Sequence, residues 1–234
     1  MVEDHSELVK EHFTNRYHKN WEYDDLIRKL IPKYEEMHFK VINLISFPKD
    51  KKINVLDLGI GSGQTALEIL KKFPNSFIDG IDIAGDMIEK SKNRLKGYLD
   101  RVNFYNQDMK KFDFKKKYDL IVAVLSIHHL TFEEKQIFYR KLYQILNEGG
   151  ILIVGDIIKF NSKEKTQKKE EEWKDFLINN LGKKEGKFWF DNYLEEDIPE
   201  TIENQLKWME ESGFNEFNSV WEHINYGVFY GRKK

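Results

Sequence analysis

Three aspartates and a run of glycines are the residues of this chain best placed to do chemistry. Asp57 precedes the run Gly59-Ile60-Gly61-Ser62-Gly63, and Asp82 and Asp108 follow further along. Glycines let the backbone turn tightly and approach a ligand with no Cβ in the way. A carboxylate can accept the hydroxyls of a ribose or an amino proton of adenine, and it attracts an ammonium group. These residue types in this order predict a site for a nucleoside that carries positive charge.

The spacing of the glycines separates this loop from a dinucleotide site. Such a site has the spacing G-x-G-x-x-G at the start of a helix. Here Gly63 comes two residues after Gly61, and Gln64 stands where the dinucleotide loop has its third glycine. Asp57, aimed at the loop, would also repel a pyrophosphate. A nicotinamide-dependent dehydrogenase is therefore disfavoured.

These residues need a scaffold that brings them together, and short apolar runs alternating with helical segments supply one. Such repeats predict a parallel sheet with helices on both faces. Ligands bind these sheets outside the carboxyl ends of the strands, where all three aspartates map. We expect the glycines of Asn147-Glu148-Gly149-Gly150 to stop a helix. The expected strands are Ile53–Leu58, Phe77–Asp82, Val102–Asn106, Tyr118–Leu125 and Ile151–Ile158, and the expected helices run to about Phe73, from about Gly85 to Leu95 and from Phe132 to Leu146.

For this length we expect one domain over residues 1–234. The segments on either side of the core do not repeat its alternation of strands and helices. Residues 1–47 space their apolar side chains as a helix does, with a break at Pro32, and predict an N-terminal helical cap. Residues 159–212 predict a helical insertion, and residues 213–234 a closing hairpin. Within these segments we expect a solvated helix face over Lys163–Glu172, a buried side formed by Trp173, Phe176, Leu177 and Leu181, and strands over Phe214–Trp221 and Tyr226–Gly231.

The composition excludes several classes of protein. The 38 basic and 40 acidic side chains nearly cancel, so no global field attracts nucleic acid or an anionic membrane. The chain has no cysteine, which excludes disulfides, thiolate zinc sites and cysteine nucleophiles. Its first residues are acidic and lack an apolar signal core, and no apolar run approaches the ~20 residues of a membrane helix. We expect a cytoplasmic enzyme, a monomer or homodimer, with a small-molecule substrate.

Residues 53–158 resemble the class I S-adenosylmethionine-dependent methyltransferases, on the strength of the glycine loop, the three aspartates and the turn Gly149-Gly150-Ile151-Leu152. The resemblance implies a Rossmann-like three-layer α/β sandwich with a mostly parallel seven-stranded sheet and an antiparallel C-terminal strand. It implies S-adenosylmethionine as cofactor, its methionine moiety near Asp57, its ribose near Asp82 and its adenine near Asp108. The cofactor contacts that it implies are Tyr34, Asp57, Gly59, Ile60, Gly61, Gly63, Asp82, Ile83, Met87, Asp108, Met109, Val124 and Ser126.

Further motifs are similar to a subgroup of small-molecule methyltransferases and to carboxy-S-adenosylmethionine synthase. The segment Pro32-Lys33-Tyr34 resembles one in the synthase whose tyrosine touches the cofactor. Trp208 stands where the synthase has an arginine for the extra carboxylate, so we expect that this chain does not make that product. The segment Ser126–His129 replaces the Asn/Asp-Pro-Pro-aromatic signature of enzymes that methylate adenine bases or glutamine amides, which makes those acceptors less favoured.

His128 and His129 are the candidates for a general base, because histidine titrates near neutral pH. The alternative is that one caps the next helix or packs on the cofactor while the other faces the core. We expect no metal site, because adjacent histidines point in different directions and no nearby carboxylate has ligand spacing. His223 and Tyr226 could also face the pocket. Aromatic side chains near both ends either roof the pocket or pack helices onto the sheet: Tyr17, Trp21, Tyr23, Tyr34, Trp173, Phe188, Trp189, Phe190 and Tyr193.

The sequence therefore predicts methyl transfer to an N or O atom of a small-molecule acceptor. Another use of the same cofactor, such as intramolecular cyclisation or a different group transfer, stays open because the motifs report only the cofactor. A binding module with a vestigial pocket is a third possibility, and the complete set of aspartates and glycines argues against it.

Overall fold

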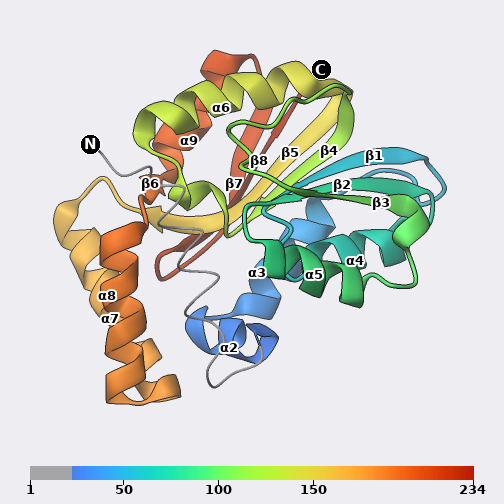
Figure 1. Ribbon diagram of the computed structural model, residues 1–234. Helices are drawn as coiled ribbons and strands as arrows, with labels where there is room; N and C mark the ends of the chain where they lie inside the picture. Colours follow the sequence, from blue (N-terminus) through green and yellow to red (C-terminus); the bar gives the residue numbers. More distant parts are fainter. Residues whose placement is uncertain (1–22) are drawn as a thin grey trace.

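One twisted sheet forms the centre of the molecule (Figure 1) in the computed structural model, which describes residues 23–234. Its strand order is β3-β2-β1-β4-β5-β8-β7, and the first five of these strands run parallel. β8 is antiparallel to both of its neighbours, so the expected mostly parallel sheet with an antiparallel C-terminal strand is confirmed. The strands are β1 (Ile53–Leu58), β2 (Ser76–Asp82), β3 (Val102–Asn106), β4 (Tyr118–Val124), β5 (Leu146–Lys159), β7 (Glu216–His223) and β8 (Tyr226–Arg232), and a short strand β6 (Glu200–Thr201) pairs with the end of β5.

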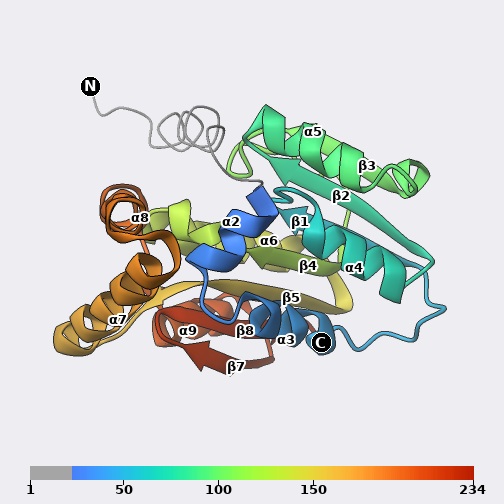
Figure 2. The same ribbon diagram turned by 90° about the horizontal axis from the view of Figure 1, so that it is seen from below.

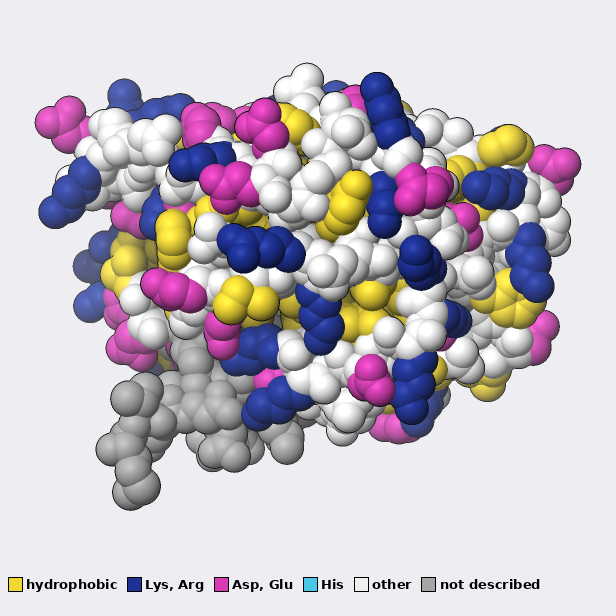
Figure 3. Space-filling model, turned by 90° about the horizontal axis from the view of Figure 1, so that it is seen from above, with side chains coloured by type: hydrophobic (Ala, Val, Ile, Leu, Met, Phe, Trp, Pro, Cys, Tyr) yellow, Lys and Arg dark blue, Asp and Glu magenta, His cyan; other side chains and the backbone are white. Residues whose placement is uncertain are grey.

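Helices cover both faces of the sheet and complete the three layers (Figures 1 and 2). On one face lie α3 (Tyr34–Leu44), α4 (Gln64–Lys72) and α5 (Gly85–Arg94), and on the other lie α6 (Phe132–Ile145) and α9 (Ile202–Ser212). The surface over α6 and α9 mixes lysine and arginine with acidic side chains (Figure 3), without a patch of one sign. Both faces of the sheet are thus buried, which is why the central strand β4 is apolar apart from Asp119.

Three helices stand at one end of the sheet. The helix α2 (Tyr23–Leu30) packs against α7 (Lys163–Leu181), and α7 pairs with α8 (Lys183–Glu196). Trp173 of α7 is buried and its indole Nε1 donates to the carbonyl of Leu30, 2.8 Å away. The break expected at Pro32 is present between α2 and α3. Among residues 23–234, none of the helices combines the length and the apolar character needed to cross a bilayer.

The junction of α6 and β5 differs from the expected helix stop. α6 ends at Ile145, and Leu146 is already paired with Tyr118 of β4. The next pair joins Ile151 to Leu120, so residues 147–150 bulge out of the ladder. Gly149 takes its positive φ of 73° inside this bulge and not at the helix end. Because Leu146 is fully buried, its place in the core ends the helix before the glycines do.

Gly80 of β2 lies directly beneath Ile60 of the glycine loop and leaves room for the loop to pack on the sheet. A Cβ built at Gly80 would lie 2.3 Å from Cδ1 and 3.2 Å from Cβ of Ile60. A glycine inside a buried strand commonly marks such an approach. The loop therefore sits directly on β2, which it could not do over a larger residue.

We expect Gly80→Ala to lower the free energy of unfolding by about 1–3 kcal/mol in urea denaturation, because the added methyl overpacks Ile60. Gly97→Ala is the matched control, since nothing lies within 4 Å of its built Cβ. Adding Ile60→Val should restore part of the loss by removing the nearest carbon. Equal stability of Gly80→Ala and wild type would show that Ile60 moves aside without cost.

Candidate functional site

A cavity opens where the carboxyl ends of β1, β2 and β4 meet, with an empty volume of about 990 Å³, its mouth included. The parallel register brings these ends to one edge, since Leu58 pairs with both Ile81 and Ala123. Of the residues predicted to hold the cofactor or act in catalysis, those that line the cavity are Tyr34, Gly59, Ile60, Gly61, Asp82, Ile83, Met87, Asp108, Met109, Val124, Ser126 and His129. Asp57, Gly63 and His128 do not line it.

Asp82 is held at the end of β2 by two backbone donors. The N–H of Gly61 donates to its Oδ2 over 2.8 Å, and the N–H of Ala84 donates to its Oδ1 over 2.9 Å. Burial raises the pKa of Asp82 to about 6 although both hydrogen bonds favour the charged form. Each oxygen keeps a lone pair with which it can accept a hydroxyl of a ribose.

Asp57 lies beneath the glycine loop with only 1% of its surface exposed. Within residues 23–234 its Oδ2 has no hydrogen-bond partner. Burial, and secondly the charge of Asp82, raise the pKa of Asp57 to about 7. A buried carboxylate of this kind is stabilised by a nearby cation. The pair of acids therefore fits a ligand that carries ammonium and sulfonium groups, with Asp57 acting through the loop and not by lining the cavity.

Two glycines of the loop have structural roles that differ from ligand contact. Gly59 has a φ of 72°, and a Cβ there would lie 2.5 Å from Cβ of Ser126. Ser126 donates its hydroxyl to the carbonyl of Leu58 at 2.7 Å and so ties β4 to β1. Gly63 begins α4 with a φ of 82° and packs on Ser91. Gly63 thus allows α4 to approach α5 and lies behind the loop.

The far end of the cavity is built after β3. Asp108 accepts the N–H of Lys110 at 2.8 Å, which fixes the turn that carries Asp108 and Met109. The side chain of Asn106 donates to the carbonyls of Asp82 and Ile83 and ties this turn to β2. Sequence reasoning did not identify several further lining residues, which are chiefly polar side chains around the loop and one histidine from the cap: His38, Ser62, Gln64, Thr65, Ile81, Gln107, Lys110 and Leu130.

The helix α2 closes over the loop through a polar clasp. Ser62 donates its hydroxyl to Asp24 of α2 at 2.9 Å, and Arg94 of α5 pairs with both Asp24 and Ser62. Tyr23 of α2 and Tyr34 of α3 both line the cavity. The predicted aromatics Tyr17 and Trp21 lie outside the described residues.

A second cavity of about 680 Å³, open mouth included, adjoins the first and shares Tyr23, Leu125 and His129 with it. Leu125 has a positive φ of 56°, a strained conformation for a residue with a side chain. The remaining walls come from α2, α7, α8 and the sheet: Ile27, Leu30, Ile31, His128, Ile157, Trp173, Trp189, Asn192, Tyr193, Glu196, Asp197 and Tyr226. Phe188 is exposed, Phe190 is buried in the core, and His223 lines neither cavity.

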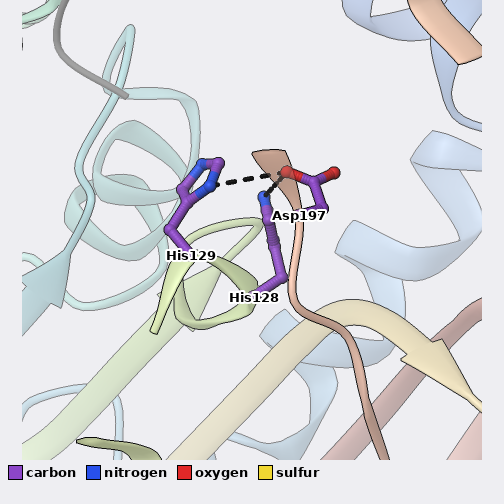
Figure 4. A group of neighbouring side chains, drawn as sticks. All are labelled: His128, His129 and Asp197. Atoms are coloured by element: carbon purple, nitrogen blue, oxygen red, sulfur yellow. Dashed lines mark ion pairs between the residues drawn. The ribbon is translucent and has the colours of Figure 1, made fainter. Parts of the chain in front are cut away.

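The polar end of the second cavity is a cluster of histidines and carboxylates (Figure 4). His128 Nδ1 bonds Asp156, and Asp156 Oδ2 also accepts the backbone N–H of His128. Burial opposes the charged form of His128, but the carboxylates of Asp156 and Asp197 outweigh it and raise its pKa. Burial raises the pKa of Asp197 to about 6 against the attraction of His128.

This cluster corrects the prediction that the two histidines point in different directions. Their rings are 4.0 Å apart at the centroids, and both face Asp197 instead of pointing apart. No carboxylate close in sequence has ligand spacing, as expected, but the fold brings Asp197, which follows α8, to within 3.6 Å of both rings. Asp156 was also missed. Its signal was a single charged residue within the apolar run Ile151–Ile158 of a doubly covered strand.

Trp208, which we align by sequence with an arginine of the synthase, does not lie at the first cavity. It is buried between α6 and α9, with its ring 4.8 Å from that of Phe132, and lines neither cavity. Within residues 23–234, no arginine lines either cavity.

Comparison with known proteins agrees with this geometry. A family model described as a methyltransferase domain matches residues 55–150. A carboxy-S-adenosyl-L-methionine synthase of Campylobacter lari is 25% identical over 214 residues, covering 88% of each chain. A malonyl-acyl-carrier-protein O-methyltransferase of Ilyobacter polytropus is 36% identical over 100 residues, 43% of this chain and 36% of that protein. The fold is similar to that of human N-acetylserotonin methyltransferase, whose structure was solved with S-adenosylmethionine (TM-score 0.57, 17% identity). The match covers 84% of this chain and 51% of that protein.

We expect Asp82→Ala to weaken S-adenosylmethionine binding by about 1–3 kcal/mol, the value of charge-assisted hydrogen bonds. Isothermal titration calorimetry measures the change, and Asp100→Ala, at an exposed position, is the control. An unchanged dissociation constant in a folded Asp82→Ala protein would remove Asp82 from the cofactor site.

The raised pKa of Asp57 predicts pH-dependent binding. Its carboxyl is largely protonated below its folded pKa of about 7, and a cationic ligand prefers the ionised form. The dissociation constant of S-adenosylmethionine should therefore fall about tenfold from pH 6 to pH 8. Most of this dependence should be lost in Asp57→Asn, where the titration of Asp82, with its pKa of about 6, still contributes near pH 6. Because the unfolded carboxyl ionises near 3.8, the ligand-free protein should lose stability as pH rises from about 4 to 7, and Asp57→Asn should remove that loss. The same pH slope in both proteins would contradict the role given to Asp57.

Proposed function

Because the chain belongs to the class I S-adenosylmethionine-dependent methyltransferase family, we propose that it transfers a methyl group to an oxygen or nitrogen atom of a small acceptor held in the second cavity. The observation that carries this proposal is the shared wall of the two cavities. Tyr23, Leu125 and His129 line both, so an acceptor in the second cavity meets the cofactor at this boundary.

The chain's task in this reaction is alignment. When bound, S-adenosylmethionine supplies a methyl group electrophilic enough for direct displacement. Holding the acceptor atom in line with it accounts for most of the acceleration in such a reaction. The clasp between Asp24, Ser62 and Arg94 keeps α2 over the loop, which excludes water from the boundary.

The walls of the second cavity describe the acceptor. Ile27, Leu30, Ile31 and Ile157 offer apolar surface, and the ring of Trp173 meets those of Tyr193 and Tyr226 edge to face at 5.0 and 5.9 Å. The polar groups gather at the end nearest the cofactor. These walls suit a compact apolar or aromatic body whose single hydroxyl or amine points toward the histidines.

A second reaction is favoured by one observation, the 88% mutual coverage with the carboxy-S-adenosyl-L-methionine synthase of Campylobacter lari. That product carries an added carboxylate, which needs a cation beside it. Of the lining residues in the described part of the chain, the one lysine is Lys110, and it pairs with Glu134 at 2.9 Å. Methyl transfer is therefore the better reading of these cavities.

The test combines mass spectrometry with one cavity-filling variant. We expect S-adenosylhomocysteine and a methylated product from a panel of phenols and aromatic amines, and none without acceptor. Ile27→Phe fills the second cavity and should raise the KM for the acceptor at least about tenfold, as steric changes in apolar pockets do. Affinity for S-adenosylmethionine should stay within about twofold, because Ile27 does not line the first cavity.

Asp25→Phe places the same ring on an exposed position of α2 and is the matched control. An unchanged KM in Ile27→Phe would place the acceptor elsewhere. Methylthioadenosine without acceptor, or a cofactor derivative with an added carboxylate, would replace methyl transfer by another use of the cofactor.

A further inference from the structure

Three potential ligand atoms surround one point at the polar end of the second cavity (Figure 4). His128 Nε2 lies 3.6 Å and His129 Nδ1 lies 3.5 Å from the same oxygen, Oδ1 of Asp197. All three atoms lie within 4.8 Å of one another. Direct N–H···O hydrogen bonds would bring these atoms to about 2.7–3.2 Å. The three side chains are thus close to one another, but their facing atoms are too far apart for direct hydrogen bonds.

These separations match those of ligands around a shared ion. Zinc binds histidine nitrogen at about 2.0–2.1 Å and carboxylate oxygen at about 2.0–2.2 Å, in tetrahedral geometry. Two such ligands at the tetrahedral angle stand about 3.3–3.5 Å apart. The observed 3.5 and 3.6 Å therefore leave room for one ion between the three side chains.

The surroundings of His128 have the form that metal sites use. A ligating histidine commonly donates its other ring N–H to a carboxylate, which fixes its tautomer and orientation. His128 Nδ1 bonds Asp156 in this way, so Nε2 is left to face Asp197. Asp156 is itself 2% exposed and fixed, because it also accepts the backbone N–H groups of His128 and Ile157.

Asp197 is positioned by the fold, although it follows the end of a helix. The N–H of Ile198 donates to the carbonyl of His128 at 2.9 Å. Lys135, buried beneath, donates from Nζ to the carbonyl of Ile198 at 2.6 Å. These contacts hold the segment after α8 against the histidines, so the three ligand atoms come together without a conformational change.

We propose that His128, His129 and Asp197 bind one zinc-like divalent transition metal ion, whose open position faces the boundary of the two cavities and takes the acceptor oxygen. Three protein ligands and one open position are the form of catalytic zinc sites. The ion lowers the pKa of a bound hydroxyl, whose proton is released to water. The alkoxide or phenolate oxygen then forms the new bond to the methyl carbon while the sulfur keeps the electron pair of the broken bond.

This acceptor role rests on the proposed function, whereas metal binding by the cluster does not. Metal binding is therefore tested without cofactor or acceptor. Untagged full-length protein is treated with EDTA, dialysed and titrated with Zn²⁺ against a chromophoric chelator. We expect one tight site per chain, and Co²⁺ in its place should give the visible absorption bands of a tetrahedral N/O site.

Variants assign the site to the cluster. Asp197→Ala and His129→Ala should each weaken Zn²⁺ binding at least about 100-fold, and Asp156→Asn about 10–100-fold through His128. His223→Ala, which removes a histidine outside the cluster, should bind as wild type does. Circular dichroism verifies that each variant is folded, and Asp156→Asn serves where an alanine variant is not.

The outcomes separate the two proposals. Absence of tight binding by the wild type, or equal binding by wild type and folded Asp197→Ala and His129→Ala, would overturn the metal site. A metal-binding cluster with no methylated product from any acceptor would contradict the proposed function alone. Methyl transfer that is equally fast after metal removal would overturn the role of the ion in activating the acceptor.

Discussion

Two carboxylates buried at one edge of the sheet, Asp57 and Asp82, are the interaction on which the site depends. Burial is the main cause of the raised pKa of both carboxyls, and the charge of Asp82 raises the pKa of Asp57 further. The backbone N–H groups of Gly61 and Ala84 stabilise Asp82, while Asp57 has no comparable donor on its Oδ2 within residues 23–234. The ligand-free protein thus retains an electrostatic cost that a cationic ligand removes. Such a cost is expected at a binding site and has no use in a purely structural core.

The cap couples the two cavities because one short helix contacts both. α2 is clasped to the glycine loop through Asp24, and its last residue, Leu30, accepts the indole N–H of Trp173. Tyr23 at its start lines both cavities, and Ile27 lines the second. A movement of α2 would therefore change the glycine loop and the walls of the second cavity together. In the proposed reaction this arrangement would tie binding of the cofactor and of the acceptor to the same helix.

The sheet and the cofactor cavity could be predicted because local signals determine them. Each signal lies within a few residues of sequence: the apolar run Ile53–Leu58, the glycine spacing after it, and Asp82 at the end of the next strand. The parallel register of β1 and β2 then brings the ends of these strands together. The cluster at His128 could not be predicted, because Asp197 reaches it only through the packing of α7 and α8. The same is true of Trp208, whose burial between α6 and α9 depends on how α9 returns to the sheet. The predicted end of α6 was wrong for a related reason, because the burial of Leu146 in the core ends the helix before the glycines.

The proposed acceptor cavity depends largely on a part of the chain that lies outside the methyltransferase-domain match. The methyltransferase-domain match spans residues 55–150 and includes the glycine loop, Asp82, Asp108 and both histidines. Asp156, Trp173, Asn192 and Asp197 all lie beyond it and form much of the second cavity and its polar end. Because the histidines need Asp197 to form a cluster, even residues inside the family core take their chemical environment from the segment outside it.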